Sequence, residues 1–585
     1  MKNFKRGKQF LILFFLMTGF VKAQTIINGH NIIDASKMRF LTSDKDSGKI
    51  TMNQVDDEQI FTVTTSDQPQ FIYQLANKIP TKHTNLSKDQ VFLLSFQAKT
   101  VFSSLETGEA KMLWLFRQSE SYQDNLTSTL SISSDWQEYF IPFQATRDIS
   151  KDDFRLVLQY GFKPQEFLIK DIKFQVYPRG TEVTSLPKTK ISYVGMEADA
   201  EWRQKANERI EMLRKGKFTV QLLKDGQPAA HQNISIKLVK HAFPFGAAMD
   251  AQDIVEGNLK YENFKKAFHY TVLANDLKIK AWNRENKRKA TLEALDVLEK
   301  DDIDVKGHVL IWPGFQYLTP EVRQNRDNPE KVTEIMETHV NNLLEVTKGR
   351  IFKWDVVNEA YTNKDLQKIT GSEQILYDGF KAAKKHQPLA LRYTNEYGII
   401  SKGGIDTKKQ QWYYDFIKRI DANTGGLVQG IGIQCHIGSD LTPPERVLEL
   451  LNYYASLGKQ IGVSEFTMDV QDPEIREQYT RDFMIAAFSH PYVSEFLFWG
   501  CTDDDRDKVD IYTEDGQIGV MGKAFFSLVH EEWKTNVYGE TNENGEASGR
   551  GFFGTYEYSF VKDGKVIKGT FDLLPRKNST FKINI

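Results

Sequence analysis

Short apolar runs alternate with amphipathic helical stretches from Phe243 onward, and this alternation constrains the fold more than any other feature of the chain. Strands that alternate with helices are typical of βα units around a parallel sheet. Eight such units predict a closed (β/α)₈ barrel, the TIM-barrel architecture, over residues 241–533; a doubly wound open sheet is the alternative. The predicted strands begin near Phe243, Tyr270, Val305, Phe352, Ala390, Gly430, Ile461 and Glu495.

The regions on both sides of the predicted barrel have strand patterns of their own. In residues 24–185, short alternating segments are separated by Asp, Ser, Asn and Gly turns, which predicts an all-β jelly-roll sandwich. Residues 534–585 contain alternating runs around the turn signal at 562–565, which predicts a small β-module packed on the barrel. The chain has 585 residues, enough for several domains.

Residues 186–240 are expected to connect the sandwich to the barrel through a linker, a helix and a β-hairpin. The helix is predicted over residues 197–214, where an apolar side chain recurs every four positions. Two strands, 218–222 and 234–238, are predicted to form the hairpin, joined through Asp225-Gly226.

Residues 1–23 have the pattern of a secretory signal peptide. Cationic side chains precede an apolar run from Phe10 to Phe20, and small residues precede the expected cleavage before Gln24. The run is too short to span a bilayer comfortably, so we expect export to the periplasm or the exterior rather than a membrane anchor. Cleavage makes the formal net charge of −2 more negative, which disfavours a nucleic-acid partner, because it removes Lys2, Lys5, Arg6, Lys8 and Lys22.

The chain has only two cysteines, Cys435 and Cys501, so a disulfide framework is not expected. No group of Cys and His residues has the spacing of a zinc site. The sequence therefore predicts neither a metal site nor a cofactor.

Two of the predicted strands end in a glutamate. Residues 354–359 read WDVVNE and end in Glu359, and residues 461–465 read IGVSE and end in Glu465. A carboxylate at the C-terminal end of a barrel strand points into the mouth, where this fold places its active sites. Cleavage of a glycosidic bond needs one protonated and one ionised carboxyl, and the mutual field of two nearby carboxyls separates their pKa values. The pair therefore predicts a glycoside hydrolase.

Three motifs and the order of the strands carry a resemblance to a known family. The motifs are GHVLIW at 307–312, WDVVNEA at 354–360 and GIGIQCH at 430–436. With them the chain resembles glycoside hydrolase family 10, the endo-β-1,4-xylanases, over roughly residues 229–533. The resemblance implies retaining hydrolysis of internal β-1,4 bonds in xylan, with Glu359 as general acid/base and Glu465 as nucleophile.

The same resemblance implies which side chains hold the sugar. Asn358 matches the amide that bonds the sugar 2-hydroxyl, and His436, beside Gln434, matches the histidine that orients the nucleophile. Trp499 matches the aromatic floor of a sugar subsite. The full set of implied sugar-binding residues is Asn275, Lys278, His308, Trp312, Asn358, Gln434, His436 and Trp499, and Asn395 and Tyr397 are implied to lie behind them.

Several positions depart from the family pattern, and they are expected near the sugar subsites. A sugar-binding carboxylate of the family is Ala274 here, a tryptophan is Ile279, and a histidine is Pro313. A second tryptophan of the family is replaced within residues 504–507. These changes leave another plant or algal β-glycan as an alternative substrate, and a non-catalytic polysaccharide-binding protein as the third reading.

The predicted N-terminal sandwich leaves two functions open. Residues 136–143 and 167–174 resemble the closing strands of carbohydrate-binding modules, which stack sugars on exposed aromatic side chains. Aromatic side chains in a sandwich also form its core, so a structural role is the alternative. Because every predicted catalytic residue lies beyond Phe243 and barrels fold as autonomous units, we expect a chain without residues 24–190 to keep most of its hydrolysis of soluble oligosaccharides.

Overall fold

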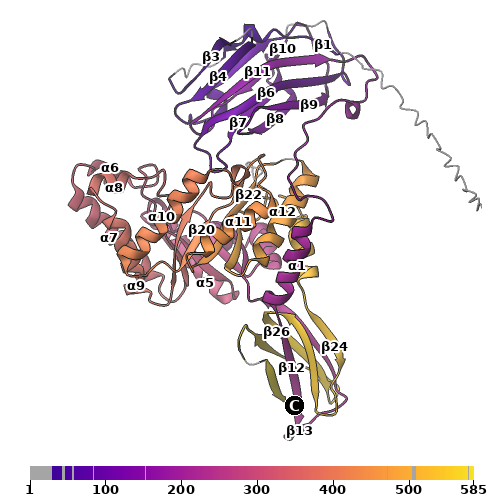
Figure 1. Ribbon diagram of the computed structural model, residues 1–585, viewed down its shortest axis with the longest axis vertical. Helices are drawn as coiled ribbons and strands as arrows, with labels where there is room; N and C mark the ends of the chain where they lie inside the picture. Colours follow the sequence, from indigo (N-terminus) through magenta and orange to yellow (C-terminus); the bar gives the residue numbers. More distant parts are fainter. Residues whose placement is uncertain are drawn as a thin grey trace, which may run out of the picture.

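The computed structural model describes residues 29–41, 46–55, 58–82, 85–151, 153–470, 472–503, 509–577 and 579–585. Figure 1 shows three domains along the long axis of the molecule, with the helix-covered barrel in the middle and a β-domain at each end. The predicted signal peptide, residues 1–23, and the segment 504–507 lie outside the described residues.

The N-terminal domain consists of two antiparallel sheets around one core. The strand order of the first sheet is β3 (Gly48–Val55), β4 (Glu58–Thr65), β11 (Gln165–Val176), β6 (Val91–Ser103) and β9 (Gln137–Gln144), with β1 (His30–Asn31) beside β11. The order of the second is β2 (Arg39–Phe40), β5 (Ala76–Pro80), β10 (Phe154–Gln159), β7 (Ala110–Gln118) and β8 (Asp124–Ile132).

Aromatic side chains fill the space between these two sheets. Phe92, Phe116 and Phe174 are all fully buried, and the rings of Phe116 and Phe174 meet edge to face at 4.9 Å. Trp114 is fully buried as well, whereas Trp136 is 37% exposed and has the Lys170 ammonium 5.0 Å from its ring. The aromatic residues of the central strands therefore serve the core.

The predicted closed barrel of eight parallel strands is confirmed. Its strands pair in chain order, with β20 directly beside β22, and the eighth strand, β23, pairs with the first, β15, to close the ring. The eight strands are β15 (Phe245–Met249), β16 (Tyr270–Leu273), β17 (Asp304–Ile311), β18 (Lys353–Asn358), β19 (Leu391–Glu396), β20 (Gly430–Ile433), β22 (Gln460–Met468) and β23 (Val493–Phe498). A two-residue strand, β21 (His436–Ile437), pairs with the end of β22.

Two glycines of the barrel are required by the large rings beside them. A Cβ atom on Gly307 would lie 2.2 Å from the Trp354 ring, and one on Gly430 would lie 2.1 Å from the Tyr393 ring. Both rings are fully buried, so neither can move aside without disturbing the barrel interior.

Helices cover the outside of the barrel (Figure 1). The helix after β22 begins where Asp472 accepts the N–H groups of Glu474 and Ile475, with Pro473 at the first helical position. The larger helices are α5 (Glu285–Lys300), α7 (Pro329–Val346), α9 (Gln374–His386), α10 (Thr407–Thr424), α11 (Pro444–Ala455) and α12 (Pro473–Ser489). Shorter ones are α2 (Ala251–Glu256), α3 (Leu259–Ala267), α4 (Ile279–Trp282), α6 (Pro320–Gln324), α8 (Asp365–Thr370) and α13 (Val520–Phe525). Within the described part of the chain, no helix is both long and apolar enough to cross a membrane.

The predicted hairpin of strands 218–222 and 234–238 is wrong. The first strand, β12 (Lys215–Lys224), pairs across Asp225-Gly226 with the short β13 (Gln227–Pro228). The second, β14 (Asn233–His241), lies in a different sheet. Both strands bury alternate apolar side chains in the same core, so they face each other across a sandwich instead of pairing edge to edge.

The remaining strands of this sandwich come from the end of the chain. Besides β13, β12 pairs with β25 (Glu546–Phe552) and, in parallel, with β28 (Thr580–Asn584). The other sheet has the order β24 (Asn536–Glu540), β14, β26 (Gly554–Lys562) and β27 (Lys565–Leu573). The barrel is therefore inserted between two parts of one β-domain.

The predicted helix before β12 is α1 (Glu201–Arg214), which begins four residues later than expected. Its buried side chains are Trp202, Ala206 and Ile210, as the four-residue recurrence predicts. Arg203 of this helix forms an ion pair of 2.7 Å with Asp482 of α12 and fixes the helix on the barrel.

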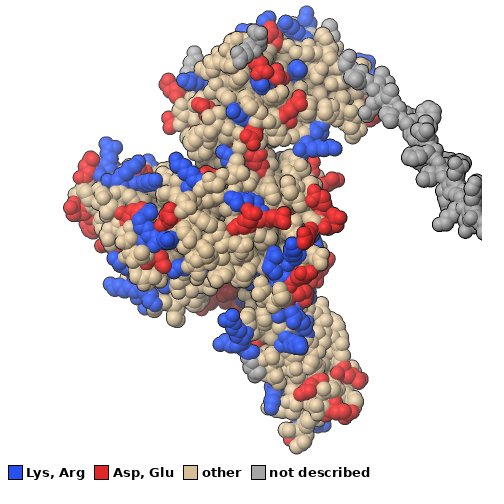
Figure 2. All heavy atoms as spheres, viewed as in Figure 1, with Lys and Arg blue, Asp and Glu red and all other residues tan. Residues whose placement is uncertain are grey.

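Charged side chains of both signs are interspersed over all three domains on the face shown in Figure 2. That face has no extended cationic surface of the kind that binds nucleic acid.

Candidate active site

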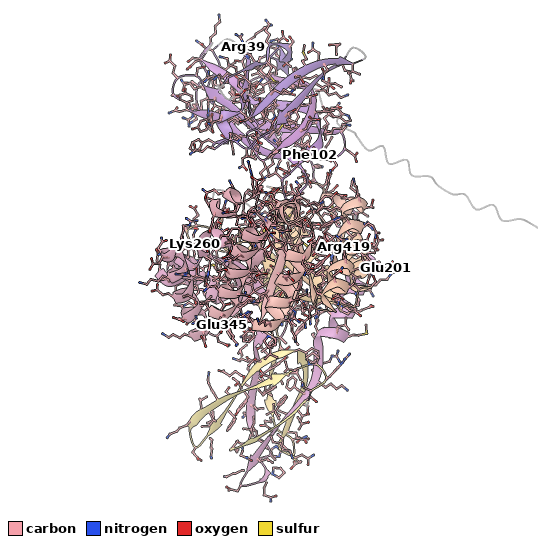
Figure 3. All side chains as sticks on the ribbon, turned by 90° about the vertical axis from the view of Figure 1, so that its left-hand side faces the viewer. Arg39, Phe102, Glu201, Lys260, Glu345 and Arg419 are labelled. Carbon is pink, nitrogen blue, oxygen red and sulfur yellow. The ribbon has the colours of Figure 1, made fainter. Side chains whose placement is uncertain are left out.

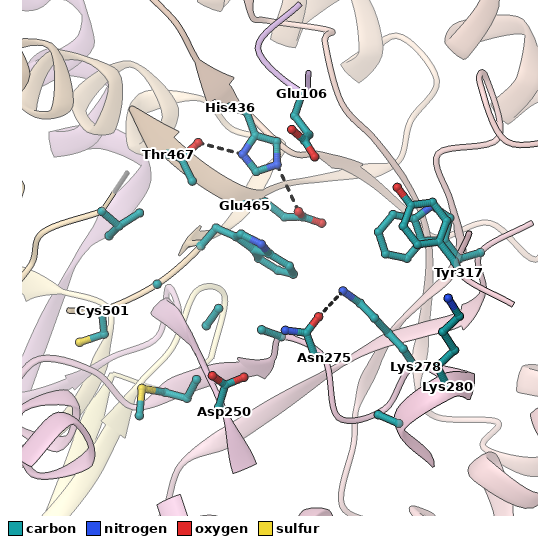
Figure 4. A pocket seen from close by; sticks show the side chains of 18 of the residues that line it. Glu106, Asp250, Asn275, Lys278, Lys280, Tyr317, His436, Glu465, Thr467 and Cys501 are labelled. Carbon is teal, nitrogen blue, oxygen red and sulfur yellow. Dashed lines mark hydrogen bonds and ion pairs between the residues drawn. The ribbon is translucent and has the colours of Figure 1, made fainter. Parts of the chain in front are cut away.

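A cleft of about 560 Å³ lies at the C-terminal ends of the barrel strands. Ala274 lines it together with seven of the predicted site residues. Figure 4 shows Glu465 and His436 on one side of this cleft, and Asn275 and Lys278 on another. The seven are Asn275, Lys278, Trp312, Glu359, His436, Glu465 and Trp499.

Glu359 follows β18 and is 6% exposed. Its backbone φ of 53° lies in the left-handed region, which costs a non-glycine residue about 1–3 kcal/mol and marks a conformation held by its surroundings. The carboxyl group accepts hydrogen bonds from Trp312 at 3.1 Å, Gln434 at 3.1 Å and Asn363 at 3.3 Å. The carboxyl is therefore fixed from three sides.

The pKa of Glu359 is raised to about 8, so the group is largely protonated at neutral pH. Burial is the largest cause, followed by the charges of Glu396, Glu106 and Glu465, while the hydrogen bond from Gln434 opposes them. From the sequence, we expected the mutual electric field of Glu359 and Glu465 to separate their two pKa values. In the structure that field contributes less than burial.

Glu465 lies in β22 and is 4% exposed. Burial raises its pKa, but the hydrogen bond from His436 and the charges of His308, His436 and Lys278 outweigh burial, and the pKa is lowered. Asn395 donates a hydrogen bond of 2.7 Å to the other oxygen and is itself held by the Ser464 hydroxyl at 2.6 Å. Glu465 is therefore ionised where Glu359 is protonated.

Thr467 fixes the ring of His436. The His436 Nδ1 atom lies 2.8 Å from the Thr467 hydroxyl, and Nε2 lies 3.3 Å from the Glu465 carboxylate. The Thr467 hydroxyl can either donate to Nδ1 or accept from it, and in both cases Nε2 can carry a proton that faces the carboxylate. This arrangement lets His436 donate to Glu465.

A chain of buried ion pairs lies behind His308. The Asp355 carboxylate is 3.0 Å from His308 Nδ1 and 3.1 Å from the Lys306 ammonium. Lys306 in turn lies 2.9 Å from Glu495. Because a carboxylate only accepts, Nδ1 carries a proton, and among the described residues Nε2 has no hydrogen-bond partner. His308 is 1% exposed and is absent from the cleft lining, so the structure places it behind the cleft surface.

The other predicted sugar-binding residues surround this point. The Lys278 ammonium donates to Asn275 at 2.9 Å and lies 4.8 Å from the Trp312 ring. The Trp499 ring meets His308 edge to face at 5.2 Å. Asn358 is fully buried, accepts from Gln434 at 3.2 Å, and its Nδ2 has no hydrogen-bond partner in the described structure.

Asn395 and Tyr397, predicted to lie behind the sugar-binding residues, contact protein groups. Asn395 bonds Glu465, and the Tyr397 hydroxyl donates to Thr362 at 3.3 Å. The Lys409 ammonium lies 3.2 Å from the centre of the Tyr397 ring and 3.0 Å from the Glu396 carboxylate.

Three of the four departures from the family pattern lie among the described residues, and they have different positions. Ala274 lines the cleft, so the missing carboxylate changes its surface. Ile279 is buried in α4, and the Pro313 carbonyl accepts the N–H groups of Asp365 and Leu366. Ala274 is therefore the departure that alters the cleft lining directly.

Sequence reasoning missed several residues of the cleft. Tyr317 stacks on Trp312 with ring centroids 3.3 Å apart. Its position in the sequence, shortly after Trp312, could have indicated that it lines the cleft. Glu106 and Lys163 also line the cleft, although both belong to the N-terminal sandwich. The cleft lining therefore extends beyond the barrel that holds every predicted site residue, and retention of hydrolysis without residues 24–190 stays a prediction. No group of His, Cys, Asp and Glu side chains suited to a metal ion occurs among the described residues.

A family model described as Glycosyl hydrolase family 10 matches residues 235–512. Endo-1,4-beta-xylanase 3 of Arabidopsis thaliana is 26% identical over 343 residues, which are 58% of this chain and 44% of that protein. Endo-1,4-beta-xylanase A of Caldicellulosiruptor sp. is 26% identical over 314 residues, 48% of this chain and 45% of that protein. The chain thus spans less than half the length of these two relatives.

Among solved structures, xylanase 10B of Thermotoga petrophila in complex with xylobiose has a TM-score of 0.45 and 22% identity, covering 50% of this chain and 95% of that chain. The match to the family model is a match of sequence, and the matched residues include all eight strands of the barrel. Residues 235–512 therefore form a domain of glycosyl hydrolase family 10.

Proposed function

We propose that this protein hydrolyses internal β-1,4 bonds of xylan with retention of anomeric configuration. The observation that carries the proposal is the pair of buried carboxyls in one cleft with opposite pKa shifts, raised for Glu359 and lowered for Glu465. Glycoside hydrolysis by double displacement needs this combination of one acid and one anion.

In the proposed reaction, the Glu465 carboxylate attacks the anomeric carbon while Glu359 donates its proton to the departing glycosidic oxygen. The product of this step is a glycosyl ester on Glu465. Glu359, now ionised, takes a proton from a water molecule, and the hydroxide attacks the anomeric carbon and releases Glu465. Asn395 and His436 hold the nucleophile, and Trp312 and Gln434 hold the acid.

We expect kcat/KM to follow a bell-shaped pH profile. Glu465 must be ionised, so activity falls on the acid side only below the ordinary glutamate range, because its pKa is lowered. Glu359 must be protonated, so activity falls as the pH rises through about 8. Steady-state rates measured across the pH range give both limbs, and a basic limb near about pH 5 would contradict the roles assigned to the two groups.

Replacing Trp499 by alanine is expected to raise KM about 10-fold with little change in kcat, because stacking on a sugar ring stabilises ground state and transition state alike. Trp136→Ala is the matched control, since Trp136 lies in the sandwich and is absent from the cleft lining. Kinetics on soluble oligosaccharides separate the two variants. A large fall in kcat for Trp499→Ala would exclude a purely sugar-binding role.

A second substrate, another plant or algal β-glycan, is favoured by Ala274, which replaces a carboxylate in the cleft lining. The test is reducing-sugar release by the full chain from a panel of soluble polysaccharides that includes xylan, mixed-linkage glucan and mannan. Release from xylan alone supports the first proposal, and release from another glycan alone supports the second. A chain that binds a glycan but cleaves none would be a binding protein.

A further inference from the structure

The N-terminal sandwich is fixed on the barrel by buried polar contacts that both domains supply. Glu109 of the sandwich is fully buried and accepts the N–H groups of Ser439 at 2.7 Å and Asp440 at 2.8 Å. In the opposite direction, the Asp440 carboxylate accepts from the Ser133 hydroxyl at 2.6 Å and the Ser134 N–H at 2.9 Å. Undocking would break this reciprocal set of buried hydrogen bonds.

These contacts are made on the barrel segments that carry catalytic groups. Ser439 and Asp440 follow β21, which carries His436. Asp469 follows β22, which carries Glu465, and its side chain forms an ion pair of 2.9 Å with Lys111 of the sandwich. The sandwich is therefore fixed on the segments that follow the strands of His436 and Glu465.

From this position one loop of the sandwich enters the cleft. Figure 3 shows Phe102, near the end of β6, at the edge of the sandwich that faces the barrel, while Arg39 lies at the far edge. The loop that continues from β6 to β7 carries Glu106, which lines the cleft and lies beside His436 in Figure 4. Glu106 forms an ion pair with Lys163, which lines the same cleft from the loop between β10 and β11.

Glu106 contributes to the electrostatic environment of Glu359. Its negative charge is the third largest influence on Glu359, after burial and Glu396, and it raises the pKa of Glu359. It also contributes to raising the pKa of Tyr317 and Tyr397, after burial and nearer carboxyls. The side chains of Glu106 and Lys163 are 26% and 33% exposed, so both remain accessible to a ligand.

We propose that Glu106 and Lys163 are specificity-determining residues that contact a sugar unit bound next to Glu359, so that the sandwich forms one wall of the active-site cleft. This inference rests on the proposed function. The carboxylate accepts and the ammonium donates hydrogen bonds to sugar hydroxyls.

The test compares Glu106→Gln and Lys163→Met in the full chain with Glu58→Gln and Lys170→Met. The control pair is an ion pair of 2.6 Å in the same sandwich, and neither of its members lines the cleft. We expect kcat/KM on soluble oligosaccharides to fall about 10-fold in both cleft variants, the size expected from losing one charge-assisted hydrogen bond. The controls should match the wild type.

The pH profile separates a role at the site from a merely structural role. Removing the negative charge of Glu106 should move the basic limb of kcat/KM to lower pH, and removing the positive charge of Lys163 should move it to higher pH. Displacements of the basic limb in opposite directions in the two variants support the proposal. The proposal would be overturned if both cleft variants kept the wild-type kcat/KM and pH profile. It would also be overturned if both lost the same activity while the basic limb of the pH profile stayed in place.

The test of the proposed substrate is separate from the test of Glu106 and Lys163. A wild type that leaves xylan intact but cleaves another glycan of the panel overturns only the proposed substrate, and the variants are then compared on that glycan.

Discussion

Replacing Glu465 by alanine is expected to lower kcat/KM by more than about 10⁴-fold, beyond the range that proton transfer alone contributes. The covalent glycosyl-enzyme forms only on the carboxylate that faces the anomeric carbon, and no other group can take its place. The loss is measured as the rate of oligosaccharide cleavage, and circular dichroism establishes that the barrel remains folded.

Covalent labelling identifies the nucleophile directly. A 2-deoxy-2-fluoro glycoside with a good leaving group should trap the intermediate, because fluorine destabilises the cationic transition state of deglycosylation. Peptide mapping should place the sugar on Glu465, and Glu465→Ala should abolish labelling. Asp469 is the other carboxylate that peptide mapping must distinguish from Glu465, because it follows the same strand. We expect no label there, since its side chain is 3% exposed and paired with Lys111. A sugar found on Asp469, or inversion seen by NMR early in the reaction, would refute the assignment.

Replacing Glu359 by glutamine is expected to lower kcat on xylan by about 10²–10⁴-fold, the usual contribution of general acid–base catalysis. The amide keeps the shape of the side chain but has no proton to give to the leaving oxygen. A substrate with an activated leaving group needs little protonation, so its glycosylation step should slow much less. Pre-steady-state kinetics on an aryl glycoside and steady-state kinetics on xylan measure this difference.

Glu373→Gln is a matched control for this substitution, because Glu373 also lies in the barrel domain but pairs with Arg419 on the outside. We expect it to behave as the wild type. If xylan and the aryl glycoside lost their glycosylation rates equally in Glu359→Gln, Glu359 would not be the acid.

The barrel and its paired carboxyls could be predicted because their signals are local. Each strand is a short apolar run, and Glu359 and Glu465 directly follow such runs, so strand and site residue are read from one stretch of sequence. The positions of Asn395 and His436 beside Glu465 depend on which strands become neighbours, and the closed barrel supplies that order.

The features that escaped prediction depend on contacts between distant parts of the chain. Strand β12 has the same alternating pattern whether it pairs with β14 or with β25, so pattern alone cannot select its partner. Glu106 lies in a polar loop of another domain, and nothing in that loop's sequence indicates that it lines the cleft. The size of the pKa shift of Glu359 likewise depends on burial and on neighbours from three separate segments.

The split β-domain sets an order of events during synthesis. Strands β12 and β14 leave the ribosome before the barrel, whereas β24, β25, β26 and β28, with which they pair, follow it. Translation of the roughly 300 residues in between takes on the order of 15–60 s at typical rates. During that interval the two strands have open edges that can pair with other chains. A nascent chain is therefore most vulnerable to aggregation while its barrel is being made, and that interval ends when the last strands emerge.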